Sequence, residues 1–360
     1  MQTGNSDLAA QILDKARWAP SGDNTQPWRF EIAAPDHIVI HGFDTRSDCV
    51  YDLEGHATHL AHGTLIQSIE YAASEHGCRT AWQRRSGSSD SNPRYDIKLE
   101  ESADISPHPL AEWISKRATQ RRPMLPRQLS AEEKRALEEA VGPNFSIKWL
   151  ATGLFERIRF GKFLFQAARL RLLTPEAFEV HRRIIEWGAK ESKDKIPETA
   201  VGLSPPTLKI SKWTFESWNR MAFMNGIPGA TWGPRIELDF LPGVFCAAHY
   251  ALIANKNPET VEDYVKAGMA VQRLWLTAAS LGIQHQPEMT PLIFRHYVQN
   301  TIQFTENTKA SVAANALNNH PAWQLFSQDE ADRACWMGRL GKRRVATRSI
   351  RLDLDDLMQK

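Results

Sequence analysis

Residues 19–28 combine turn-forming and hydrogen-bonding side chains in a spacing that suits ligand binding. The segment reads Ala-Pro-Ser-Gly-Asp-Asn-Thr-Gln-Pro-Trp, and Pro27 biases Gln26 toward an extended conformation. Such a corner leaves the polar groups of Ser21, Asn24 and Gln26 free to converge on a flat, polar ligand. The same residue types also favour ordinary tight turns, so a purely structural corner is an alternative at this point.

Two regular elements must position this corner. Before it, Ser6 caps a predicted helix whose apolar residues recur every four positions up to Ala16, and Pro20 ends that helix. After it, apolar and polar residues alternate from Trp28 to Ile32, which predicts a strand packed on one face. The corner therefore joins a helix to a strand.

This corner resembles a segment of the FMN-dependent nitroreductase family. In that family a Pro-Ser-x-x-Asn-x-Gln-Pro-Trp segment lies against the flavin ring, and in the usual homodimer it comes from the opposite subunit. The resemblance implies an α+β, three-layer fold with FMN as cofactor. It also implies that five corner residues bind FMN: Pro20, Ser21, Gly22, Asn24 and Gln26.

The chain contains an internal repeat. One copy begins at Gly63 (GTLIQSIEYAASEHG) and the other at Gly268 (GMAVQRLWLTAASLG), with equal lengths and no gap. Gly63 matches Gly268, and Gln67 matches Gln272. Each copy is predicted to form a long helix that ends at its final glycine.

A second stretch repeats the order of helix, corner and strand. Residues 129–141 are predicted to form a helix with a capping box made by Ser130 and Glu133. Gly142-Pro143 follows, and apolar residues then alternate from Phe145 to Trp149, as in a strand. The polar corner residues are missing here, so this copy keeps the scaffold without that binding loop.

The family resemblance places the phosphate-binding residues in the second copy. Nitroreductase-like chains usually open with an Arg-x-Ser-x-Arg segment that binds the flavin phosphate. Here the matching segment contains Arg117, Thr119 and Arg121. Guanidinium groups bind phosphate oxygens through a bidentate fork, and a threonine hydroxyl adds a directed donor. Arginine runs also occur on solvated surfaces, and that alternative stays open for residues 117–122.

Two further segments match the family's flavin contacts. The closing basic segment from Gly341 to Arg351 implies phosphate or ribityl contacts from Lys342 and Arg348. Gln286 and Pro287 follow the second repeat helix, where family members place a loop against the flavin ring. A nucleic-acid patch is disfavoured at the basic segment because no aromatic residues are interleaved and the formal net charge is only +2.

These assignments predict an internally duplicated fold in which one chain mimics the usual homodimer, as a monomer or a weak homodimer. The predicted lobes are residues 1–106 and 107–360. They share one FMN site, because the corner belongs to one copy and the phosphate-binding segment of residues 117–121 belongs to the other. Residues 188–242 depart from the family and form a predicted insertion. Its aromatic residues suggest a lid, with core filling or a dimer contact as alternatives. The candidate lid residues are Trp213, Trp218 and Trp232.

The expected function is an FMN-dependent oxidoreductase that uses NADH or NADPH to reduce a planar aromatic, quinone or nitro-type acceptor. Alternatives are flavin-dependent dehydrogenation or flavin fragmentation on a specialised substrate, and an FMN-sequestering protein without turnover. Flavin chemistry requires no dedicated side-chain acid or base, so no catalytic residue is assigned.

Other classes of protein find little support. His56, His59 and His62 recur on one helix face but lack the HExxH arrangement and an obvious carboxylate ligand, so no metal site is expected. No GxGxxG, GxxxxGK or GxSxG motif is present. The four cysteines form no CxxC pair, and no signal peptide or membrane-spanning stretch stands out. A cytoplasmic protein is therefore expected, without a nucleic-acid or membrane partner.

Overall fold

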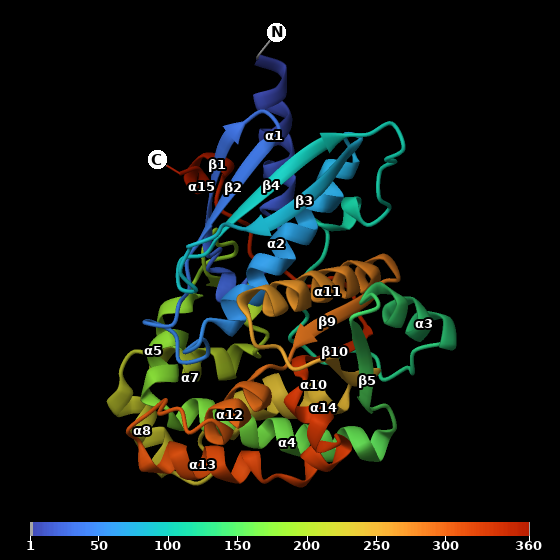
Figure 1. The fold of residues 1–360 in the computed structure, drawn as a ribbon. Coiled ribbons are helices and arrows are strands. Elements are labelled where there is room, and N and C mark those ends of the chain that lie inside the picture. Colours follow the sequence, from blue (N-terminus) through green and yellow to red (C-terminus); the bar gives the residue numbers. More distant parts are fainter. Residues whose placement is uncertain (1–2, 360) are drawn as a thin grey trace.

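The computed structural model of the protein describes residues 3–359, with side chains from Leu8 onward. Two four-stranded antiparallel sheets, each accompanied by helices, make up an α+β architecture (Figure 1). The first sheet is built from residues 28–101 and the second from residues 145–342. Two long helices, one from each half, lie between the sheets (Figure 1).

The first half has the strand order β1-β2-β4-β3. Its elements are α1 (Thr3–Ala16), β1 (Trp28–Ala34), β2 (His37–Gly42), α2 (His56–Ser74), β3 (Cys78–Arg84) and β4 (Arg94–Glu101). The predicted strand after the corner is confirmed, since Trp28 and Phe30 are fully buried in β1. Helix α1 begins at Thr3, so the prediction that Ser6 caps it is wrong. Thr3, Asn5 and Ser6 are all capping residue types, and the local sequence does not choose among them.

The second half has the strand order β5-β8-β10-β9. Its corresponding elements are α3 (Ala131–Ala140), β5 (Phe145–Ala151), β8 (Ala248–Ala254), α11 (Val261–Ser280), β9 (Ile283–Pro287) and β10 (Ala334–Lys342). The predicted capping box is confirmed, because Ser130 Oγ accepts from the Glu133 amide and Glu133 accepts from the Ser130 amide. In both sheets the strands, taken in chain order, stand in the spatial order first, second, fourth, third.

The two long helices α2 and α11 meet at glycines. A Cβ atom on Gly63 would lie 1.9 Å from the carbonyl oxygen of Val265, and one on Gly268 would lie 2.0 Å from the carbonyl oxygen of Leu60. Only glycine therefore permits this approach of the two backbones.

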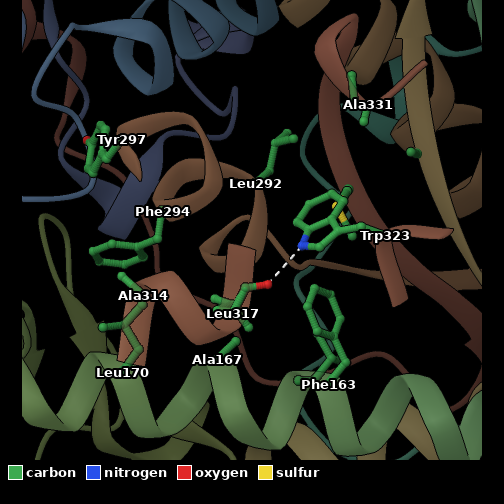
Figure 2. Close-up of a cluster of buried hydrophobic side chains, with 14 of the residues drawn as sticks. Phe163, Ala167, Leu170, Leu292, Phe294, Tyr297, Ala314, Leu317, Trp323 and Ala331 are labelled. Carbon is green, nitrogen blue, oxygen red and sulfur yellow. Dashed lines mark hydrogen bonds between the residues drawn. The ribbon is translucent and has the colours of Figure 1, made fainter. Parts of the chain in front are cut away.

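A layer of helices covers the second sheet on the side away from the first half (Figure 1). Side chains of α4, α12 and α13 form its core, with Phe163 and Leu170 of α4 facing Phe294 and Leu317 (Figure 2). The buried Trp323 donates its indole N–H to the carbonyl oxygen of Leu317 at 2.9 Å (Figure 2). The helices of this layer are α4 (Leu154–Leu173), α5 (Pro175–Ile184), α12 (Thr290–Gln299), α13 (Thr308–Asn318) and α14 (Gln328–Asp332).

The predicted insertion consists mainly of short helices. They are α6 (Glu198–Val201), α7 (Pro205–Thr214), α8 (Trp218–Gly226), α9 (Trp232–Arg235) and α10 (Leu241–Val244), with a π-helical turn over Ile236–Phe240. Two short strands, β6 (Ile185–Glu186) and β7 (Ile196–Pro197), pair in parallel before them.

The C-terminal segment returns to the first half. After β10 the chain runs past the space between the sheets and forms α15 (Leu354–Leu357), whose Leu357 is fully buried with residues of α1 and β1. The Gln359 amide donates to the carbonyl oxygen of Phe30 at 2.7 Å. Residues 343–352 are thereby held between the two halves.

Candidate functional site

A cavity of about 300 Å³ lies where the two halves meet, and we call it the junction cavity. The first half contributes the corner and part of α2. The second half contributes residues 117–121, α11, β9 and β10, and residues 347–351 of the returning segment. The polar and aromatic residues that matter below are Trp18, Ser21, Asp23, Asn24, Arg117, Thr119, Arg121, Trp275, Gln286, Trp336, Thr347, Arg348, Ser349 and Arg351.

The corner is held in an uncommon conformation by its own side chains. Asp23, Asn24 and Gln26 have positive φ angles of 52°, 65° and 47°, which non-glycine residues seldom adopt. The side-chain nitrogen of Gln26 donates to the carbonyl oxygen of Lys193 at 2.9 Å, and its side-chain oxygen accepts from the backbone amide of Leu352 at 3.0 Å. These bonds tie the corner to the insertion and to the C-terminal segment.

Asn24 plays a similar role at the cavity wall. Its amide nitrogen lies 3.0 Å from the carbonyl oxygen of Lys193 and 3.2 Å from that of Ile350. Ser21 Oγ accepts from the Gln26 amide at 2.9 Å. The corner is therefore rigid where it meets the cavity.

Three arginines gather at one end of the junction cavity. The Arg117 guanidinium lies 4.7 Å from the ring of Trp275 and donates to the carbonyl oxygen of Trp18 at 2.9 Å. Arg348 lies 4.7 Å from the ring of Trp18, and Arg351 donates to the carbonyl oxygen of Ala19 at 3.2 Å. Their hydrogen bonds go to backbone carbonyls rather than to acidic side chains.

These arginines have no counter-ion within the described side chains, residues 8–359. Burial, with repulsion from Arg351 and Arg348, holds the pKa of Arg117 well below its usual value. Burial and the neighbouring Arg348 lower the pKa of Arg351 to about 9. Such shifts indicate uncompensated positive charge, which an anionic ligand would neutralise.

Thr119 and two indole rings, tilted at 54° to each other, complete the wall of the junction cavity. Residue 119 is aligned by backbone pairing with His285, and the Gln120 amide donates to the His285 carbonyl at 2.9 Å. Trp275 and Trp336 lie beside His285 and also line the cavity. Three buried polar atoms of lining residues have no partner within the described part of the chain: Asn24 Oδ1, Arg117 Nε and Gln286 Oε1.

A second space of about 290 Å³ adjoins the junction cavity, and we call it the side chamber. The two spaces share wall residues that include Asp23, Arg121 and Gln286. Burial raises the pKa of Asp23, against the lowering effect of the Arg121 charge. The apolar part of the wall comes from α4, α5 and the insertion, including Leu164, Ile184, Ile210, Phe215, Met221 and Met224. Five further charged residues also line this space: Arg171, Arg235, Asp239, Glu288 and Arg339.

A buried ion network includes Glu288 and Arg339, which also line the side chamber. Glu288 accepts from Arg339 at 2.8 Å and from His249 Nδ1 at 2.7 Å, and His249 Nε2 donates to the carbonyl oxygen of Gly243 at 2.7 Å. Burial opposes protonation of His249, but the Cys246 sulfur and the Glu288 carboxylate raise its pKa to about 10. Both ring nitrogens are committed as donors, so this group is structural.

The structure brings most of the predicted site residues together. Ten of them line the junction cavity: Pro20, Ser21, Gly22, Asn24, Arg117, Thr119, Arg121, Gln286, Pro287 and Arg348. Gln26 is buried behind the corner rather than in the wall. Lys342 lies elsewhere, with its ammonium 3.0 Å from Glu133 beside α3.

The three predicted lid tryptophans do not line either space. Trp213 is exposed beneath the Arg220 guanidinium, and Trp232 is 54% exposed and packs edge-on against Phe165. Trp218 packs against Phe178. The insertion does line the side chamber, through other residues such as Phe215 and Met221.

Sequence reasoning missed several cavity residues. Trp275 and Trp336 carry no local signal, because long-range packing alone brings them to the cavity. Arg351 and Asp23 could have been predicted as cavity residues from the sequence. Arg351 belongs to the closing basic segment, and Asp23 belongs to the corner.

The fold and the site thus define an α+β protein with a composite, cation-rich cavity. No family model matches the sequence. The chain is 22% identical over 289 residues to Uncharacterized protein MT1398 of Mycobacterium tuberculosis (strain CDC 1551 / Oshkosh), a match that covers 80% of this chain and 39% of that protein. The chain therefore spans about two-fifths of the length of this relative.

A solved structure is also similar, the nitroreductase-like family protein from Bacillus cereus. The TM-score is 0.32 at 10% sequence identity, and the match covers 70% of this chain and 96% of that one. A likeness at this level carries no argument about the site. None of the helices within residues 3–359 combines the length and the apolar character that crossing a membrane requires.

Proposed function

We propose that this chain is an FMN-dependent oxidoreductase with one FMN in the junction cavity. The observation that carries the proposal is the group formed by Arg117, Arg348 and Arg351, which are buried or half-buried at one end of a cavity built from both halves. Guanidinium groups without carboxylate partners suit a phosphate monoester, which they bind through paired N–H donors.

The rest of the cavity fits the remainder of such a ligand. Asn24 Oδ1 and Gln286 Oε1, which have no partner in the described part of the chain, are acceptors, so a flat heterocycle with N–H donors would satisfy both. FMN, when bound, supplies hydride and electron transfer, while protein groups position its ring. Ser21 and Thr119 add hydroxyl groups to the same wall.

We further propose that the chain is an internal duplication that serves as a pseudo-dimer. The common strand order of the two sheets and the paired glycines of α2 and α11 support a duplicated unit, with lobes at residues 1–106 and 107–360. In this proposal the corner from the first lobe and the arginines from the second build one site. A second chain is not needed to complete it, which favours a monomer.

The side chamber would receive the electron acceptor. Apolar side chains make up much of its wall, and four of its charged residues form two pairs, Arg171 with Asp239 and Arg339 with Glu288. Two further arginines of the wall, Arg121 and Arg235, donate to backbone carbonyl oxygens. A neutral, largely apolar molecule therefore suits it better than an anion. We propose reduction of a quinone or nitroaromatic acceptor at the expense of NADH or NADPH.

The test is turnover by the FMN-loaded protein with NADH or NADPH and a quinone. We expect steady oxidation of the nicotinamide that requires FMN. Arg348→Ala should lower this activity, and a higher FMN concentration should restore it. Arg344→Ala should leave the activity unchanged, because Arg344 is exposed outside the cavity. Bound FMN without turnover, or equal activity in both variants without added FMN, would contradict the proposal.

A further inference from the structure

Three potential metal ligands converge outside the junction cavity. Glu54 lies in the turn just before α2, His56 is the first residue of α2, and His296 lies on α12. One ligand atom from each residue falls within 4.8 Å of the others. The first half therefore supplies two of these groups and the second half the third.

The three side chains already face one another. His296 Nε2 is hydrogen-bonded to Glu54 Oε2, and the His56 and His296 rings lie 5.3 Å apart. The His56 ring stacks on Tyr264 at 3.9 Å and has no hydrogen-bond partner among residues 8–359. A stacked imidazole with both nitrogens unused is free to bind a ligand through either of them.

The surrounding structure holds the group in place. The Leu53 amide donates to the Tyr297 hydroxyl at 3.0 Å, which anchors the segment before Glu54 to α12. The Asn300 side-chain nitrogen lies 3.1 Å from His296 Nδ1 and donates to the backbone carbonyl oxygen of His296 at 3.0 Å, so it helps to fix the orientation of the ring. The nearby Arg46 guanidinium is paired with Asp44, so its charge is compensated.

A cavity of about 440 Å³ opens beside the group, and all three residues line it. Asp52, Asn257 and Asn300 add polar atoms to the same wall. A bound cation would thus have room for a water molecule as a further ligand, as in zinc sites with three protein ligands.

We propose that Glu54, His56 and His296 bind one divalent transition-metal ion of the Zn²⁺ type. Two imidazoles and one carboxylate form a ligand set that zinc accepts, whereas Ca²⁺ and Mg²⁺ prefer oxygen ligands alone. The sequence alone predicts no metal site, because no carboxylate ligand is obvious beside His56, His59 and His62. Glu54 supplies that carboxylate, and the distant His296 becomes apparent only in the folded chain.

The proposed ion would stabilise the contact between the two halves. It would link the start of α2 to α12, so its binding free energy would add to the stability of the folded chain. None of the three residues lines the junction cavity, so this proposal stands independently of flavin binding.

The experiment is a Co²⁺ titration of the chelator-treated full chain, followed by visible absorption, with Zn²⁺ as competitor. We expect one equivalent of Co²⁺ to bind, Zn²⁺ to displace it, and Zn²⁺ to raise the melting temperature. Glu54→Gln and His296→Asn should each weaken binding at least as much as loss of an outer-sphere partner does, roughly 10–100-fold.

His41→Asn is the matched control, because His41 also contacts a glutamate, Glu31, at 2.7 Å but belongs to no described three-ligand group. It should leave Co²⁺ affinity unchanged. Glu54→Gln keeps a hydrogen-bond acceptor for His296, so its fold should survive, and melting without metal checks this. Absence of Co²⁺ binding, or equal binding by all variants, would overturn the proposal, whatever the FMN content.

Discussion

Gly63 of α2 and Gly268 of α11 make reciprocal contacts. Gly63 faces the carbonyl oxygen of Val265, three positions before Gly268, and Gly268 faces the carbonyl oxygen of Leu60, three positions before Gly63. Nearby glutamines repeat this pattern. Gln67 Oε1 accepts from Arg273, the residue after Gln272, at 2.8 Å. In the same way, Gln272 Nε2 donates to the hydroxyl of Ser68, the residue after Gln67, at 2.9 Å. The interface between the helices therefore has approximate twofold character in its individual contacts.

Substitution of either glycine should be severe. In Gly63→Ala the new methyl group meets the Val265 carbonyl at 1.9 Å, and backbone on both sides prevents an easy shift. We expect the free energy of unfolding, measured in urea, to fall by about 3 kcal/mol or more, the upper end of the range for overpacked cores. Gly268→Ala should lose a similar amount.

The matched control is Gly226→Ala, because a Cβ at that position meets nothing within 4 Å. Its effect should stay within about 0.5 kcal/mol, as for most surface substitutions. Similar losses at Gly226 and Gly63 would show that the close helix contact is not as described.

The Glu288 carboxylate should be essential for stability. Glu288→Gln leaves the buried Arg339 and His249 without their shared anion. Breaking a buried pair in this way costs about 3–5 kcal/mol. Glu216→Gln, which removes an exposed pair with Arg220, should cost no more than about 1 kcal/mol. Equal unfolding free energies for the two variants would contradict the described network.

The protein should lose stability as pH falls below about 6.5, the ordinary pKa of histidine. Burial lowers the pKa of His62 to about 4, against a hydrogen bond to the Pro27 carbonyl. Burial lowers the pKa of His181 and of His285 to about 3, helped by neighbouring arginines. Because the unfolded chain gains these protons first, the stability contributed by these three histidines is complete above pH 6.5 and declines as pH falls toward their folded-state pKa values.

Unfolding in urea at several pH values between about 7 and 5 measures this decline. Each such histidine should contribute up to about 1.4 kcal/mol per pH unit. His62→Asn should reduce the slope by about one proton, while His76→Gln, at an exposed position, should not change it. A stability that is flat over this range would refute the described burial.

Much of the fold could be predicted because its signals are local. The capping box of Ser130 and Glu133 depends on residues three positions apart. The glycines that end both repeat helices, Gly77 and Gly282, have φ angles of 67° and 68°, as helix-ending glycines require. Such signals survive in a single sequence.

The site could be predicted only in part, because the type of a residue does not reveal where its side chain points in the folded chain. Lys342 lies in the basic segment but faces Glu133, a partner that only tertiary packing brings near. The insertion tryptophans suggested a lid, yet Trp213 and Trp232 are exposed while the neighbouring Phe215 and Met221 line the side chamber. Aromatic character predicts burial or stacking without predicting which surface is covered.

The most direct test of the central claim is the number of FMN molecules bound per chain, measured by isothermal titration calorimetry and by absorbance of released flavin. The junction cavity predicts one equivalent, with affinity reduced at least about tenfold in Arg117→Ala, the loss that 1.4 kcal/mol represents, and unchanged in Arg344→Ala. Two equivalents per chain, or equal affinity in the two variants, would contradict a single site shared by the two halves.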